Sequence, residues 1–180
     1  EGKLGINPFK FGIIASTDTH IGAPAPEREK NYLGSHGNDM VLEDRLLSTI
    51  KVPGDIATGS PVRYNPGGIA GIYANENSRS ALFEAMRRRE TFGTSGPRIT
   101  PRFFAGWNLD TSLCQSSDYL AQAYENGVPM GADLPPSPAG AEQSPVFVAS
   151  ANRDPRDEGN LLQRIQIIKG WIDGEGRTQQ

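Results

Sequence analysis

The sequence has few of the residues that cross-link a chain or bind metal. It contains one cysteine, Cys114, and two histidines, His20 and His36, among 180 residues. A single cysteine excludes a disulfide within the chain and a cysteine-rich zinc module. An excess of one charge is also missing, because 18 Lys and Arg against 21 Asp and Glu leave a net charge of −3. This balance gives no electrostatic footprint for nucleic acid or anionic lipid.

Long apolar runs are absent as well. Hydrophobic residues make up 36% of the chain, and no run approaches the roughly 20 residues that a membrane-spanning helix needs. Glycine and proline, in contrast, are abundant, with 21 and 14 residues, against a usual combined share of about 12%. This composition predicts many turns and loops and argues against a helical bundle. The length suits one domain or two small ones.

Local patterns predict two parts that meet near residue 98. In the first part, short apolar runs and helical spacing predict two buried strands and two helices, at residues 11–16, 67–74, 40–50 and 78–89. A turn-rich loop follows at 91–97. In the second part, alternating polarity predicts strands at 98–104, 146–149 and 164–169, with a long polar excursion over 108–145. We therefore expect a mixed α/β part at 1–97 and an antiparallel, β-rich part at 98–180, with Trp107 and Trp171 as core or interdomain anchors.

Asp18 and His20 are the most specific candidates for chemistry. They directly follow the predicted strand at 11–16, and in an extended chain residues two apart project to the same side. The carboxyl ends of strands are where α/β folds build their sites, and a carboxylate with an imidazole suits Zn, Mn or Fe. The spacing alone equally fits a histidine at a strand end that is hydrogen-bonded to a nearby aspartate.

Two further residues are candidates for binding a substrate anion. Arg98 ends the string Thr94–Ser95–Gly96–Pro97–Arg98, whose small residues and guanidinium fit either an oxyanion site or a simple turn. His36 lies in a polar loop-like stretch, where it either faces a substrate or is an exposed loop residue. Cys114 has no basic neighbour in sequence to lower its pKa, which argues against a nucleophile.

Several strings resemble a bacterial family of domains of unknown function that is related to the PHP (polymerase and histidinol phosphatase) superfamily. The matches run in order over nearly the whole chain, at residues 7–12, 16–20, 68–71, 76–79, 88–98, 103–107, 129–131 and 164–171. The resemblance implies an α/β fold followed by β structure. Residues 1–97 would form the last strand and helix elements of a distorted βα barrel, and residues 98–180 a β-sandwich-like appendage.

The resemblance also implies a function. Asp18-x-His20 corresponds to the last metal-ligand motif of that barrel, so these two residues would be both ligands and catalytic residues of a site with two or three divalent ions. The reaction would be metal-assisted hydrolysis of a small phosphoester, with Arg98 or His36 steadying its anion. The family's earlier histidine motifs precede this one, and the first 17 residues contain no histidine. We therefore expect the chain to be the C-terminal part of such a protein, and to bind metal weakly or not at all by itself.

A second hypothesis comes from the β-rich part. Long, proline-broken loops on a sandwich suit recognition more than catalysis. The chain would then be a ligand-binding or partner-binding module on a catalytically inactive PHP-like scaffold.

Overall fold

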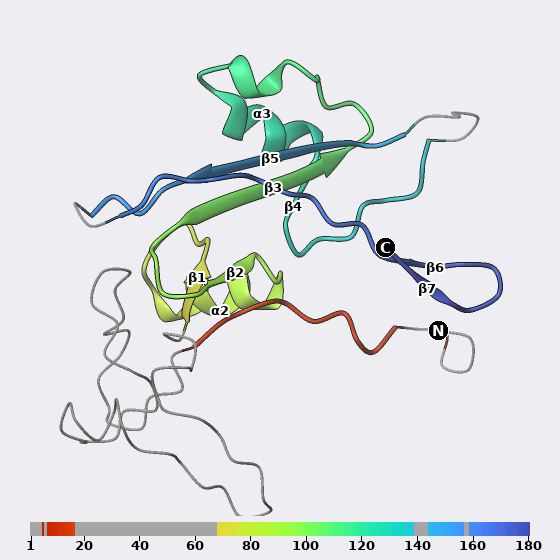
Figure 1. Cartoon of the computed structure of the whole chain (residues 1–180), viewed down its shortest axis with the longest axis horizontal. Coiled ribbons are helices and arrows are strands. Elements are labelled where there is room, and N and C mark those ends of the chain that lie inside the picture. Colours follow the sequence, from red (N-terminus) through yellow and green to blue (C-terminus); the bar gives the residue numbers. More distant parts are fainter. Residues whose placement is uncertain (1–4, 6, 17–67, 139–143, 157–158) are drawn as a thin grey trace, which may run out of the picture.

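The computed structural model describes residues 5, 7–16, 68–138, 144–156 and 159–180. Within these ranges the strands form three antiparallel sheets, which are β1 with β2, the order β4–β3–β5, and β6 with β7 (Figure 1). The predicted helix over 40–50 lies outside the described residues. The expected barrel, sandwich and domain boundary stay predictions.

The first sheet is a strand–helix–strand unit. β1 (Ile69–Ile72) and β2 (Thr91–Thr94) pair antiparallel, with Ile69 opposite Thr94, and α2 (Arg79–Arg87) connects them. Ser78 caps the helix because its side chain accepts a hydrogen bond from the Ala81 backbone N–H. The predicted helix is confirmed here, and so is the strand, although β1 is half-buried rather than buried. The predicted loop over 91–97 is wrong in its first half. Gly93 and the turn residues Gly96 and Pro97 obscured the strand pattern there, and Thr91–Thr94 pairs with β1 as a strand.

The second sheet carries the hydrophobic core. β3 (Thr100–Gly106) lies between β4 (Val128–Pro129) and β5 (Val146–Asn152). The short helix η2 (Leu113–Gln115) and α3 (Tyr119–Asn126) connect β3 to β4, and α3 covers one side of the sheet in Figure 1. The core residues come from β3, from β5 and from the connection between β3 and β4. They are Phe104, Leu109, Leu113, Ala123 and Val148. The predicted excursion over 108–145 thus contains a helix that completes the core.

Two predicted strands are not strands in the structure. The segment 10–16 is extended and lies beside β2, where the Gly68 N–H donates to the Ser16 carbonyl at 2.8 Å and the Thr91 hydroxyl donates to the Ile13 carbonyl at 2.8 Å. It is exposed rather than buried, since 72% of Ile13 is accessible. Residues 164–169 are also exposed and unpaired within the described part of the chain. Apolar alternation predicts a strand only where another strand pairs with it, and sequence alone does not show the partner.

The C-terminal residues form a separate exposed hairpin. β6 (Trp171–Ile172) pairs with β7 (Thr178–Gln179), and the Asp173 carboxylate accepts the backbone N–H groups of Glu175 and Arg177 in the turn. Trp171 is 45% exposed, so of its two expected roles, core or interdomain anchor, the core role is wrong. Trp107 is half-buried and donates from its indole N–H to the Pro135 carbonyl at 2.9 Å.

A polar network joins the first sheet to the second. The Tyr124 hydroxyl donates to the nearly buried Glu90 carboxylate and accepts from the Arg102 guanidinium at 2.8 Å. Arg102 also lies over the Tyr73 ring, 3.3 Å from its centroid, and Arg88 pairs with Glu90 at 3.3 Å. Each charged group at this junction therefore has a partner, as burial of charge requires.

The network predicts an unusual tyrosine titration. Burial, together with the hydrogen bond to Glu90 and its negative charge, raises the pKa of Tyr124 to about 12. In an absorbance titration at alkaline pH, we expect a tyrosine step near pH 12 that Tyr124→Phe removes and that the control Tyr119→Phe leaves in place. Because the pKa is higher in the folded state, the stabilisation is complete below about pH 10 and is lost as the pH rises toward 12. A titration in which Tyr124→Phe changes nothing above pH 11 would contradict the network.

Candidate functional site

A pocket opens where the first sheet meets the end of β5. It has a volume of about 570 Å³. The first sheet contributes Ile69, Gly71, Phe92 and Thr94, the loop before β3 contributes residues 97–100, and the chain leaving β5 contributes Asn152, Arg153 and Pro155. The lining is mainly apolar, and no carboxylate, histidine or cysteine is among the residues described as lining it. The described walls of the pocket, which are mainly apolar, are suited to binding an apolar group.

Asp154 fixes one wall of this pocket. Its side chain is almost fully buried, with 1% exposed, and Oδ2 accepts the Arg98 backbone N–H at 2.8 Å. The carboxylate also accepts the Arg156 backbone N–H at 3.0 Å and is bound by the Arg156 guanidinium through both oxygens. The guanidinium and these N–H groups hold the pKa of Asp154 well below its usual range. The carboxylate is thus ionised, and both of its oxygens accept hydrogen bonds that join residue 98 to the segment after β5.

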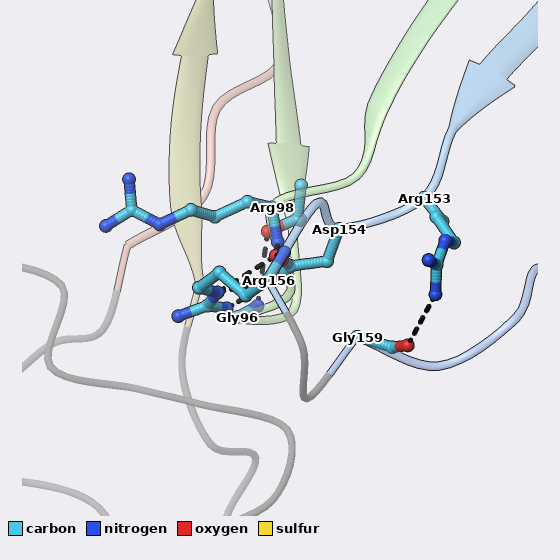
Figure 2. Close-up of polar contacts among 7 residues, drawn as sticks. Gly96, Arg98, Arg153, Asp154, Arg156 and Gly159 are labelled. Atoms are coloured by element: carbon cyan, nitrogen blue, oxygen red, sulfur yellow. Dashed lines mark hydrogen bonds and ion pairs between the residues drawn. The ribbon is translucent and has the colours of Figure 1, made fainter.

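Arg98 is the one predicted site residue that lies within the described ranges. Its side chain is exposed and lines the pocket. Figure 2 shows Asp154 at the centre of the contacts, with the Arg98 side chain extending away from it and Arg153 turned toward Gly159. The Arg153 guanidinium donates to the Gly159 carbonyl at 3.2 Å. Both arginines are therefore cations at the described wall of the pocket, and Arg98 is the one whose guanidinium has no hydrogen bond or ion pair to another described residue.

The string Thr94–Arg98 forms a turn, and not an oxyanion nest. Gly96 adopts φ +120°, which favours glycine, and its N–H donates to the Thr94 hydroxyl at 3.2 Å. The Arg98 N–H is taken by Asp154. The structure supports the turn for this string, in which the Gly96 and Arg98 N–H groups already have acceptors and the Arg98 guanidinium is available to an anion.

The predicted metal ligands and His36 lie outside the described residues. Asp18 and His20 follow Ser16, whose carbonyl accepts the Gly68 N–H next to β1. Across the ranges that the structure describes, no group of three or more His, Cys, Asp or Glu side chains is placed to hold a metal ion. Cys114 is exposed and free. The roles of Asp18, His20 and His36 stay predictions.

Sequence reasoning did not find Asp154, Arg156 or the pocket wall at Phe92. The string Arg153–Asp154–Pro155–Arg156 carries a detectable signal, since an aspartate with basic residues on both sides is a candidate for a local ion pair. Its burial against residue 98 comes from chain folding over a separation of 56 residues. Phe92 gave no signal, because its strand was itself not predicted.

A comparison with known families covers the whole chain, because one family model matches residues 1–180. The chain belongs to DUF3604. That family is described as "Protein of unknown function", which confirms the resemblance to a family of domains of unknown function. No curated protein matches the chain, and no solved structure matches it. Within the described residues of this DUF3604 chain, no helix is long and apolar enough to cross a membrane.

Proposed function

We propose that this DUF3604 chain is part of a metal-dependent hydrolase that acts on a small phosphoester, and that the family is related to the PHP superfamily. The observation that carries the proposal is the position of the Arg98 side chain, a cation without an ion pair among the described residues, on the wall of a pocket. A guanidinium of this kind pairs with phosphoryl oxygens through parallel hydrogen bonds.

The donor set of the Asp18–His20 motif supports the metal part of the proposal. A carboxylate oxygen and a neutral imidazole nitrogen fit Zn, Mn or Fe, and Asp18 and His20 would be two of the ligands of a centre with two or three ions. When bound, such ions lower the pKa of a coordinated water and stabilise charge on the phosphoryl group. The contribution of this chain is to hold the ions through Asp18 and His20 and to neutralise substrate charge through Arg98, with His36 as a second candidate for that contact.

The position of Ser16, two residues before Asp18, supports a metal centre and a substrate pocket that lie close together. Ser16 lies beside Gly68, directly before β1, and a Cβ atom on Gly68 would be 3.1 Å from the Ser16 backbone nitrogen and 2.7 Å from the Thr94 carbonyl oxygen. Ile69 and Thr94 line the pocket. Ser16 is the last described residue before the motif. It therefore lies at the same end of the first sheet as the pocket.

Removing the metal tests the proposal. In the whole protein, with any residues that precede Glu1 included, we expect 4-nitrophenyl phosphate to be hydrolysed with Mn²⁺, Zn²⁺ or Fe²⁺ present. Dialysis against EDTA should reduce the rate to background, and adding back the active metal should restore it. Hydrolysis that survives EDTA would contradict the proposed chemistry, as would a failure of all three metals to support it.

The pocket also favours a second candidate function. Since no catalytic side chain is among its described lining residues, the chain can act as a ligand-binding module on a catalytically inactive scaffold. Binding without hydrolysis by the whole protein would favour this candidate.

A further inference from the structure

The apolar pocket indicates what kind of molecule Arg98 recognises. We propose that it binds the ring or other apolar group of an organic monoester oxyanion, with the anion paired to Arg98 at the rim. Calling the bound molecule a substrate rests on the proposed function, whereas the binding itself follows from the walls and the charge of the pocket alone.

The walls are shaped for a flat apolar group. A Cβ atom on Gly71 would lie 2.1 Å from Cζ of Phe92, so the absence of a side chain at 71 lets the Phe92 ring cross β1 and form a wall. Phe92 also packs against Tyr73, whose ring centroid is 5.2 Å away. Ile69 and Ile99 line the same pocket. An aromatic ring in contact with these side chains is removed from water and gains binding free energy.

Two cations, Arg153 and Arg98, are among the described residues that line the pocket, and the proposal places the anion on Arg98. The Arg98 backbone is anchored by Asp154 at 2.8 Å, and its guanidinium has no ion pair within the described ranges. Arg153 donates to Gly159, and Arg156 is occupied by Asp154. No carboxylate is among the described lining residues, and the Asp154 carboxylate next to residue 98 is paired with Arg156.

The size of the pocket sets the ligand class. A volume of about 570 Å³ is in the range of pockets that enclose small organic molecules, roughly 300–1,000 Å³. Inorganic phosphate is much smaller and would leave the apolar walls in contact with water. An ester with an aryl or branched alkyl group uses both the walls and the cation.

Calorimetric titration of the 180-residue chain in EDTA tests the inference without any metal. The probes are 1-naphthyl phosphate, inorganic phosphate and 1-naphthol. We expect 1-naphthyl phosphate to bind about tenfold or more tightly than either of the other two, because only this probe contacts both the walls and Arg98.

Two variants separate the contributions of charge and wall. Arg98→Gln keeps the backbone N–H that Asp154 accepts, so the fold is retained, and it should weaken 1-naphthyl phosphate about tenfold while leaving 1-naphthol unchanged. Arg79→Gln is the matched control, since Arg79 is exposed, begins α2 and does not line the pocket, and it should leave all three affinities unchanged. Ile99→Trp fills the pocket and should weaken both naphthyl probes.

The outcomes distinguish this inference from the proposed function. Equal affinity for 1-naphthyl phosphate and inorganic phosphate would overturn the inference, as would equal losses in Arg98→Gln and Arg79→Gln. If Ile99→Trp unfolds the chain, the comparison of Arg98→Gln with Arg79→Gln still tests whether the pocket binds the anion through Arg98. Binding in EDTA with the expected losses, but no metal-dependent hydrolysis by the whole protein, supports the pocket and contradicts the hydrolase. Hydrolysis without binding of the naphthyl probe contradicts the pocket alone.

Discussion

Alanine at Asp18 or at His20 is expected to lower metal-dependent hydrolysis in the whole protein by on the order of a thousandfold. Loss of one ligand weakens or displaces an ion, and the stabilisation that a metal gives to the transition state is several kcal/mol. The measurement is kcat/KM for 4-nitrophenyl phosphate at saturating metal, together with the metal content of the purified variants. We expect both quantities to fall together, because the two side chains act through the metal.

The control for this experiment is Asp110→Ala. Asp110 is exposed and accepts hydrogen bonds only locally from Ser112, so its removal should change neither the metal content nor kcat/KM. Thermal unfolding of each variant shows whether the fold is retained. If Asp18→Ala and His20→Ala keep full activity and their metal, the two residues have no part in a metal centre and the binding module becomes the better description.

Arg98→Gln should affect substrate binding, whereas Asp18→Ala and His20→Ala should affect metal binding. Because Arg98 contacts the substrate anion rather than the metal, the change should raise KM about tenfold while the metal content stays the same. A substitution that removes activity by releasing the metal and one that weakens substrate binding are thus separable in the same assay.

The sequence predicted those elements whose pattern is local. The helix near residue 80 carries its own cap at Ser78 and its own apolar face, and it is present as α2. The strands at β3 and β5 have enough alternation or length to be recognised, and both are present. β2 was missed because its four residues include a glycine and run directly into the turn residues Gly96 and Pro97, and its pairing with β1 is not visible in the sequence.

The sequence singled out one residue of the described pocket wall, Arg98, as part of a string that fits either an oxyanion site or a turn. Its role as a substrate contact stays a prediction. Asp154 could not be chosen, because its importance depends on a contact with residue 98 that the sequence does not reveal. The pocket is likewise a product of tertiary packing, since its walls come from three separate segments of the chain.

Replacement of Asp154 by asparagine should be among the most destabilising substitutions that change no side-chain volume. The carboxylate joins the end of β5 to the loop before β3 through the Arg98 N–H, and it neutralises Arg156. Asparagine accepts through one oxygen only and would turn an N–H₂ group toward the guanidinium or the backbone N–H. Breaking a buried pair in this way is costly, and we expect the midpoint of thermal unfolding at pH 7 to fall by about 5 to 10 °C.

The dependence on pH gives a second test of the same pair. The pKa of Asp154 is lower in the folded state than its ordinary value of about 4. Its stabilisation is therefore complete above that value and is lost as the pH falls below it toward the folded pKa. The difference in midpoint between the wild type and Asp154→Asn should accordingly be largest near neutral pH and become smaller on acidification below about pH 4.

Asp173→Asn is the matched control for Asp154→Asn. Asp173 also accepts several N–H groups and pairs with Arg177 in the same hairpin, and its pKa is lowered by these contacts. It lies in the exposed β6–β7 hairpin, where no core depends on it, so the change in midpoint should be small. Because Asp154 also fixes the backbone of residue 98, Asp154→Asn should weaken 1-naphthyl phosphate binding, and Asp173→Asn should not. Equal effects of the two substitutions on stability and binding would show that Asp154 does not hold the pocket together.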